Sequence, residues 1–521
     1  MRGKLKPFLK STLILSLIYL VGISAILLAN VHYADDAART NYGYAGWSAF
    51  SRYSSTVLSH GIHADNYLTN VAPLPQILAA GILAISSIIL ISIVSGRKIF
   101  EEPWTKWILK LVAVVPFALC PYMLECLSYQ YDAVYMALSV FFAVMPFIFY
   151  RQKKWQFILA SMIGILGVCT TYQASIGIYP MIMIFIAMRD WNMGVQKNKE
   201  IIKNVLIAAA VFLVTLIVFQ KVLMTTRDVY VSNELPEISE FFPSLFSHLG
   251  HYFELLIIDF KMMWLVLIVI VIIGFIVLFT KRSKRNKFAA CVFGTTGAGL
   301  MLLMCYLFYA ALDKPLYTTR AMYAIGAFVA IICIYVVSGE KFRKIPEELK
   351  KKLKNKNSKA IKFASLDSEE TVFTIAVLIL AWCFFSFAFT YGNALKEQDT
   401  FRNMQVDMVI SDLNTLTNDG KIKKIQTTGQ IGFAPAIEHM PEKDYFILRR
   451  LLKSSFGADV PWMAYRLTEA SGLSNLVYDK DLDLTKKDLP ILKDTTLYTI
   501  HGDAEGILVK FKGEEFDIWE N

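Results

Sequence analysis

The chain has 521 residues, of which 55% are hydrophobic and only 18% are charged. A soluble domain carries about 25% charged residues, so this composition excludes an ordinary water-soluble protein and favours helices that face lipid. The formal net charge of +10 does not indicate nucleic-acid binding. The Lys and Arg residues form short clusters between apolar runs, as in the loops that orient membrane helices.

Neither the cysteines nor the N-terminus indicates a processed, disulfide-linked secreted protein. All seven Cys lie in or at the ends of apolar segments, and there is no CxxC pair. We therefore expect neither a disulfide framework nor a zinc site. The apolar run from Phe8 to Leu28 is long enough to span a membrane, so we expect it to be a retained first span and not a signal peptide.

A membrane-spanning helix needs about 20 mostly apolar residues. That criterion predicts spans near residues 8–29, 73–95, 108–124, 133–150, 156–171, 174–188, 202–224, 262–280, 288–311, 320–338 and 371–391.

The loops between these spans predict the orientation, because short loops rich in Lys and Arg stay inside. With the N-terminus inside, every inner loop is basic: 96–107, 151–155, 189–201, 281–287 and 339–370. The outer segments are then 30–72, 125–132, 172–173, 225–261, 312–319 and the tail. The expected fold is a polytopic α-helical membrane protein of about eleven spans, N-terminus inside and C-terminus outside.

The tail differs from the rest of the chain, since residues 392–521 are polar and contain no span. Helical spacing predicts a helix at 393–413, followed by an alternating segment at 421–427 and helices at 445–454 and 462–471. Residues 496–511 indicate a β-hairpin. We therefore expect a multispan domain at 1–391 and a small extracytoplasmic α/β domain at 392–521.

The first outer segment follows a span directly with two adjacent carboxylates, Asp35 and Asp36. In a helix, Arg39 would lie within pairing distance of either one. The structural interpretation is an interfacial helix with an ion pair and with aromatic residues such as Trp47 at the headgroup level. The catalytic interpretation is that one aspartate takes a proton from an acceptor hydroxyl, while Arg39 and Arg52 stabilise charge on a phosphate leaving group.

A second polar cluster brackets the short outer turn between two spans. Glu125 opens the turn and Asp132 closes it, with Tyr122 and Tyr129 beside them. Two interpretations stay open, since Asp132 would suit the N-cap of the next helix, whereas ionisable groups at this depth are typical of functional sites.

Two further outer positions carry polar side chains. Tyr172 and Gln173 lie in a tight turn, where hydrogen bonding between helices is the structural alternative. Arg320 begins a span at its outer end, where it would bind a lipid phosphate or act as a snorkelling anchor. His248 and His251 indicate an amphipathic interfacial helix in preference to a metal pair.

In this order, the clusters resemble those of the bacterial membrane glucosyltransferases of the O-antigen-modifying Gtr type II family, over nearly the whole chain. The matching positions are Asp35, Asp36, Arg39, Gly43, Tyr44, Trp47, Arg52, Pro121, Tyr122, Leu124, Glu125, Leu127, Ser128, Tyr129, Asp132, Tyr172, Gln173, Ser175, Thr319 and Arg320, and in the tail Asn393, Gln398, 425–429, Pro461 and Trp462.

The family is similar to the GT-C glycosyltransferases, multispan enzymes that take a sugar from a polyprenyl phosphate on the outer face and use an acidic residue of the first outer loop. The resemblance implies inverting transfer of a hexose, with glucose expected, from undecaprenyl-phosphate-hexose to a surface glycan such as O-antigen, teichoic acid or wall polysaccharide. It implies Asp35 or Asp36 as the base, without choosing between them. It implies substrate-binding roles for Arg39, Trp47, Arg52, Tyr122, Glu125, Tyr129, Asp132, Tyr172, Gln173 and Arg320.

The resemblance also implies the setting. The protein would lie in the bacterial cytoplasmic membrane, with a small flippase and a donor-synthesising glycosyltransferase as partners. Neither a cofactor nor a metal is expected, because there is no Gly-rich phosphate loop and the aspartate pair is not D-x-D.

Two other functions fit the sequence less well. A transporter of lipid-linked glycans should carry ionisable residues or broken helices near mid-membrane, and these spans carry few such residues away from their outer ends. A non-catalytic assembly factor would not need four polar clusters on the outer face.

Overall fold

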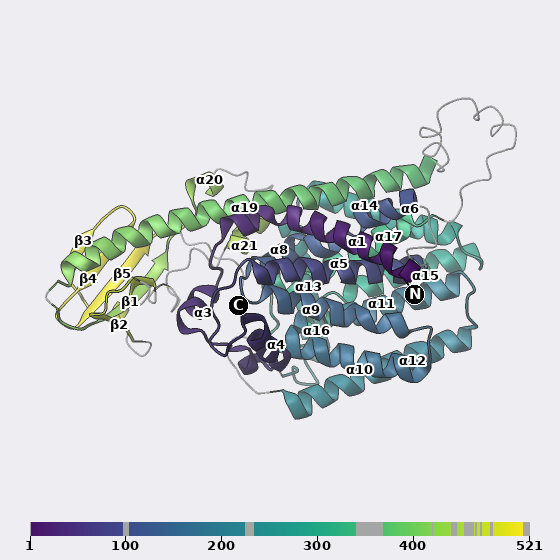
Figure 1. The fold of residues 1–521 in the computed structure, drawn as a ribbon, viewed down its shortest axis with the longest axis horizontal. Helices are drawn as coiled ribbons and strands as arrows, with labels where there is room; N and C mark the ends of the chain where they lie inside the picture. The colour runs from purple at the N-terminus through teal and green to yellow at the C-terminus, as the bar shows by residue number, and fades with distance from the viewer. Residues whose placement is uncertain are drawn as a thin grey trace.

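The structure, a computed structural model, is a long helical bundle with a small β-sheet at one end (Figure 1). It describes residues 2–96, 104–224, 234–339, 368–418, 420–438, 445–452, 463, 466–468, 471–479 and 483–513. A mostly helical chain with a small C-terminal sheet is thereby confirmed. Half of the residues of the predicted helix at 462–471 lie outside the described residues.

The bundle is built from helices of very different length. The N-terminal half contains α1 (Arg2–Gly22), α2 (Ser24–Ala29), α3 (Asp36–Tyr42), η1 (Trp47–Phe50), α4 (Tyr53–His63), α5 (Leu74–Ser95), α6 (Trp104–Ala113), α7 (Val115–Leu119), α8 (Pro121–Ser128), α9 (Ala133–Val144), η3 (Met145–Phe149), α10 (Lys154–Thr171), η4 (Gln173–Ser175) and α11 (Ile178–Asn192). The C-terminal half contains α12 (Asn198–Val218), η5 (Phe219–Leu223), α13 (Phe241–Asp259), α14 (Met262–Lys281), α15 (Lys287–Leu303), α16 (Leu307–Ala310), η6 (Thr319–Ala321), α17 (Ala324–Val337) and α19 (Ser368–Leu416).

Among the described residues, six helices are long and apolar enough to cross a membrane. A seventh span results if the bent pair formed by residues 107–119 and 121–128 is taken as one. Four shorter apolar helices of 10–17 residues lie in other predicted spans: Pro7–Gly22, Ala133–Phe149, Lys287–Leu303 and Ala324–Val337. The prediction of several membrane helices is confirmed, while the count of eleven stays a prediction.

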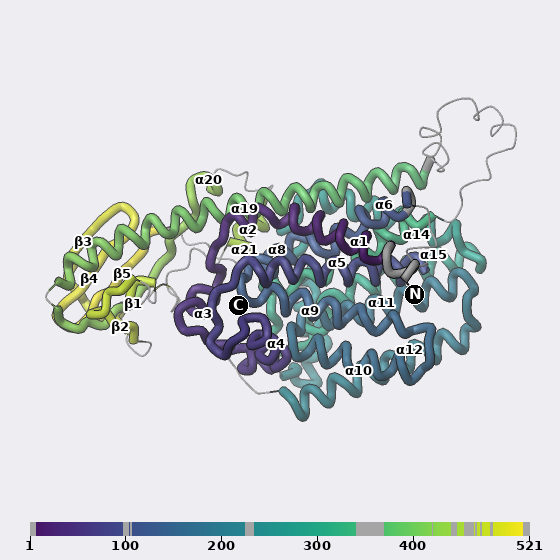
Figure 2. The backbone as a smooth tube through the Cα atoms, viewed as in Figure 1, coloured from purple at the N-terminus to yellow at the C-terminus, as the bar shows by residue number. Residues whose placement is uncertain are grey.

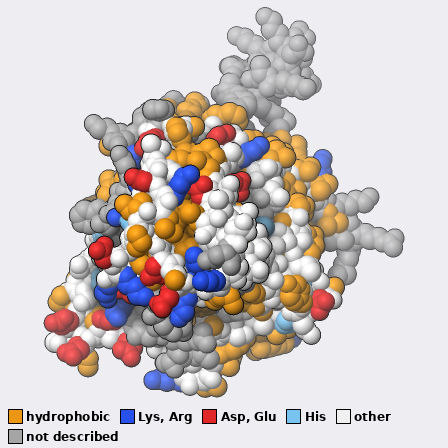
Figure 3. All heavy atoms as spheres, turned by 90° about the vertical axis from the view of Figure 1, so that its left-hand side faces the viewer, with side chains coloured by type: hydrophobic (Ala, Val, Ile, Leu, Met, Phe, Trp, Pro, Cys, Tyr) orange, Lys and Arg blue, Asp and Glu red, His pale blue; other side chains and the backbone are white. Residues whose placement is uncertain are grey.

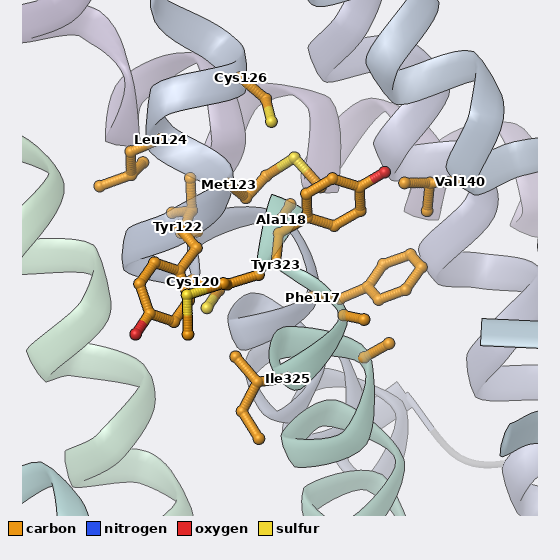
Figure 4. Packing of buried hydrophobic residues seen from close by; sticks show 14 of the residues in the cluster. Phe117, Ala118, Cys120, Tyr122, Met123, Leu124, Cys126, Val140, Tyr323 and Ile325 are labelled. Atoms are coloured by element: carbon orange, nitrogen blue, oxygen red, sulfur yellow. The ribbon is translucent and has the colours of Figure 1, made fainter. Parts of the chain in front are cut away.

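One predicted span is not straight. The axis turns by 62° between the helix that ends at Leu119 and α8, because Pro121 disfavours the helical conformation of the residue before it. Cys120 accordingly has an extended ψ of 137°. Figure 4 shows the apolar side chains on both sides of the bend packed around Tyr323 and Ile325, which lie at the start of α17.

Two of the loops predicted inside, 189–201 and 281–287, meet at one end of the bundle. There the Arg285 side chain donates to the backbone carbonyl of Trp191. Two of the segments predicted outside, 30–72 and 172–173, meet at the other end, where Arg52 donates to Gln173. Figure 2 shows α1 beginning at the end far from the sheet. We call the end that carries residues 30–72 and the sheet the outer end; which side of the membrane it faces stays a prediction.

The longest helix, α19, joins the bundle to the sheet. It runs unbroken for 49 residues, about 74 Å at the rise of an α-helix, through the predicted domain boundary at 391/392. The predicted span at 371–391 and helix at 393–413 are therefore one helix. Gly392 lies inside this helix. A Cβ there would lie 2.6 Å from the backbone of Ala25, so this glycine allows α19 to pack closely on α2.

The sheet has five strands in the order β2-β1-β5-β4-β3. The predicted hairpin is confirmed, since β4 and β5 are antiparallel, and β5 also pairs in parallel with the predicted strand β1. The short edge strands β2 and β3 were not predicted. The elements of the tail are β1 (Lys423–Gln430), α20 (Pro435–Glu438), α21 (Phe446–Leu452), β2 (Leu476–Tyr478), η8 (Leu484–Lys486), β3 (Ile491–Asp494), β4 (Tyr498–Gly502) and β5 (Gly506–Lys512).

Candidate active site

An ion pair connects the first two polar clusters. The Arg39 guanidinium, on α3, pairs with the Asp132 carboxylate at the start of α9, and both side chains are buried. A second guanidinium nitrogen lies 3.7 Å from a carboxylate oxygen of Asp35, whose side chain is 38% exposed. Asp132 stands at the N-cap position of α9 but makes no side-chain capping bond, so its carboxylate serves the ion pair and not the helix end.

Trp47 completes this first cluster. Its indole N–H donates to Asp132, and the Arg39 Cζ lies 4.5 Å from the centre of its ring. Trp47 is only 1% exposed, so its interpretation as an anchor at the headgroup level is wrong. It holds the ion pair from the side as a hydrogen-bond donor and as a cation–π partner.

Asp36 has a different environment from Asp35. It is fully buried, and one of its carboxylate oxygens accepts the backbone N–H of Tyr33 at 3.1 Å and that of Gln130 at 2.8 Å. Burial raises the pKa of Asp36 well above its ordinary value of 3.8; the hydrogen bond from Gln130 opposes this and the Asp132 charge adds to it. Asp36 thus fastens the first outer segment to the turn before α9.

A second group joins the remaining clusters. Thr319 of η6 donates to Glu125 of α8, and the Arg320 guanidinium donates to the Tyr129 hydroxyl. The Arg320 carbonyl accepts the Tyr172 hydroxyl at 3.3 Å. These bonds bring α8, η6 and the turn before η4 together at the outer end.

Arg52 extends this second group toward the first outer segment. Its guanidinium lies 4.6 Å from the centre of the Tyr172 ring, and its Nε donates to Gln173 at 3.2 Å. Arg52 and Arg320 are both half-buried, so two cations border the same region of the outer end. Figure 3 shows this end of the molecule with Lys, Arg, Asp and Glu side chains gathered on it.

Tyr129 lies between the two groups. Its ring packs edge-on against Tyr33, with centroids 4.9 Å apart. Burial raises the pKa of the Tyr129 phenol well above its ordinary value, Arg320 lowers it, and the charges of Glu125 and Asp35 raise it further. Tyr129 contacts Arg320 of the second group and Tyr33, whose backbone N–H donates to Asp36, so it connects the two groups.

The family model described as glucosyl transferase GtrII matches residues 24–331, more than half of the chain, and this range contains every side chain described so far. The chain belongs to the GtrII glucosyl transferase family. The resemblance drawn from the sequence is confirmed, and with it the expected class of membrane glycosyltransferases.

A curated phage protein is similar to part of the chain. An uncharacterized 55.3 kDa protein in the gtrB 5' region of Salmonella phage P22 is 27% identical over 175 residues. That alignment covers 33% of this chain and 34% of the phage protein, so the chain matches about a third of its curated relative. No solved structure matches the chain.

One predicted residue of this GtrII family chain lies apart from the site. The Tyr122 hydroxyl donates to a carboxylate oxygen of Asp259 at 2.6 Å, and Asp259 in turn pairs with Arg450 of the tail. Asp259 and Arg450 were not predicted. Each stands in a segment with an ordinary mixture of apolar and charged residues, so no local pattern marks them, and only the tertiary structure shows that they are buried.

Replacing Asp36 should alter the pH dependence of stability in this GtrII family protein. A carboxyl whose pKa is raised on folding contributes stability that is fully present below its unfolded pKa and is lost as the pH rises through the folded pKa. The folded pKa lies above 3.8, so the free energy of unfolding of wild type relative to Asp36→Asn should fall as the pH rises above about 4. Thermal unfolding in detergent between pH 4 and 8 measures this difference.

The contrast with Asp36→Ala tests the same contact. Asparagine keeps an oxygen acceptor for the two backbone N–H groups, whereas alanine leaves both without one, at roughly 1–3 kcal/mol each. We expect Asp36→Ala to be much less stable than Asp36→Asn at every pH. Equal stability of the two variants would contradict the fastening role.

Proposed function

We propose that this protein transfers a hexose, with glucose expected, from undecaprenyl-phosphate-hexose to a surface glycan at the outer face of the bacterial cytoplasmic membrane. The observation that carries the proposal is the partly exposed Asp35 carboxylate, held by Arg39 at the same end of the bundle as two half-buried cations. It stands in a chain of a glucosyl transferase family.

The reaction is a single displacement at the anomeric carbon. Asp35 takes the proton of the acceptor hydroxyl, whose oxygen forms the new bond to the anomeric carbon. The bond from that carbon to the phosphate oxygen breaks, and polyprenyl phosphate leaves with the bonding electrons. Attack from the face opposite the leaving group inverts the configuration.

The environments of the two aspartates support Asp35 as the base. A base must come within hydrogen-bond reach of the proton that it removes, and the Asp35 side chain is accessible. Asp36 is sealed from solvent and accepts two backbone N–H groups. Arg39, which pairs with both Asp35 and Asp132, holds the Asp35 side chain in its orientation.

The polyprenyl phosphate that leaves is bound by the second group, which contains Arg320 and Arg52. Guanidinium groups bind phosphate oxygens bidentately. The Arg52 guanidinium lies over the Tyr172 ring, and Tyr172 also donates to the backbone carbonyl of Arg320. Positive charge there stabilises the phosphate as it gains negative charge. Glu125 and Tyr129 hold η6, and with it Arg320, in position.

A reconstituted assay tests the function. Purified protein in detergent should transfer labelled glucose from undecaprenyl-phosphate-glucose to a surface glycan, and should leave UDP-glucose unused. We expect transfer to continue in EDTA. A transporter would give no product, because detergent leaves no two compartments to connect. Absence of transfer from any polyprenyl-phosphate hexose would overturn the proposal.

In the cell, a GtrII family protein with this activity requires a donor on the outer face. We therefore include as proposed partners an enzyme that makes the lipid-linked hexose and a small flippase that presents it outside.

A further inference from the structure

The tail reaches into the bundle at one short helix. α21 packs against α8, α13 and α19 (Figure 1). Arg450 of α21 and Asp259 at the end of α13 form an ion pair in which both side chains are 0% exposed. A buried ion pair is costly to desolvate and is a weak source of stability, so its place in the structure calls for another reason.

The Arg450 guanidinium holds two of the segments that carry the site. Through Asp259 it is bonded to the Tyr122 hydroxyl on α8, one turn before Glu125. Its other terminal nitrogen donates to the backbone carbonyl of Tyr317 at 2.5 Å, just before the segment that carries Arg320. The Arg450 guanidinium therefore connects α8 and the segment before η6, the same two segments that the hydrogen bond between Thr319 and Glu125 joins.

The next residue of α21 holds the third segment. The Leu451 carbonyl accepts the Tyr33 hydroxyl at 2.6 Å. Tyr33 packs against Tyr129, and its backbone N–H donates to Asp36. Two consecutive residues of the tail thus connect to three segments of the site: the first outer segment through Tyr33, the segment before η6 through Tyr317, and α8 through Asp259.

We infer that α21 is a clamp that sets the geometry of the active site, with Arg450 as its principal positioning residue. This inference rests on the proposed hexose transfer. Arg450 is buried and acts on the site through Asp259, Tyr122 and the Tyr317 carbonyl. Its contribution is the alignment of Arg320 and Glu125 with Asp35, and misalignment by about 1 Å can cost roughly 100-fold in rate.

The test separates alignment from folding. Arg450→Met alone leaves Asp259 buried without its cation and should lower the yield of folded protein. The double variant Asp259→Asn, Arg450→Met removes both charges, so its thermal stability in detergent should recover most of that loss. Its kcat for hexose transfer should nevertheless stay about tenfold or more below wild type, with a smaller change in the KM for the donor.

Two further variants sharpen the result. Arg449→Met removes the neighbouring charge of α21, whose guanidinium lies over Phe433 and outside the clamp, and should keep wild-type kcat. Tyr122→Phe deletes one bond of the clamp with no charge change, and should lower kcat while losing less stability than Arg450→Met. A double variant with wild-type kcat at recovered stability would overturn the clamp. Inactive wild-type protein would instead overturn the proposed function.

Discussion

Asp35→Asn is expected to lower the rate of hexose transfer by roughly 10²–10⁴-fold, the range over which a positioned general base contributes to catalysis. The amide cannot take the proton of the acceptor hydroxyl. The variant should fold normally, because Asp35 is partly exposed and its 3.7 Å contact with Arg39 is supplementary to the buried pair with Asp132. The measurement is kcat with undecaprenyl-phosphate-glucose, together with the thermal stability of the purified protein.

Asp65→Asn is the matched control for this experiment. Asp65 is an exposed aspartate of the same outer segment, and its side chain accepts the backbone N–H groups of Asn66 and Tyr67. We expect transfer at the wild-type rate. Full activity of Asp35→Asn, with Asp36→Asn inactive and stable, would assign the base to the buried carboxylate and contradict the role given to Asp35.

Arg39→Met is expected to destabilise the protein by about 3–5 kcal/mol, because it removes one partner of a buried ion pair and leaves the other charge uncompensated. Arg39 and Trp47 both donate to Asp132. In the variant the Trp47 indole N–H would remain as the donor among the described residues. Hexose transfer should be lost as well, since Asp35 loses the cation that orients it. Chemical unfolding in detergent gives the free energy, and the transfer assay gives the activity.

A double-mutant cycle isolates the pair. Combining Arg39→Met with Asp132→Asn should cost roughly 0.5–3 kcal/mol less than the sum of the single changes. Lys154→Met serves as the comparison, because Lys154 and Glu200 form an exposed ion pair at 3.7 Å and such pairs contribute at most about 1 kcal/mol. Strict additivity of the two changes would show that Arg39 and Asp132 do not depend on one another.

The sequence predicted the positions of the apolar helices well, because the length of a span and the charge of its flanking loops are local properties. It also predicted the hairpin of the tail from the alternation of β4 and β5. It divided the chain at 391/392, whereas α19 continues through this position and Gly392 packs closely on α2. It left open a headgroup-level position for Trp47, which the burial of this side chain excludes. An aromatic side chain near a span looks the same in sequence whether it is buried or exposed.

By itself, the sequence determined that this is a multispan helical protein with four polar clusters at one end, and it indicated the family. Composition, hydrophobic length and motif order suffice for that, because each is written along the chain. Only the tertiary structure decided that Asp36 is buried while Asp35 is accessible, and that Arg450 forms a buried ion pair with Asp259. The physical reason is that burial and pairing depend on contacts between residues up to 418 positions apart, which no local pattern encodes.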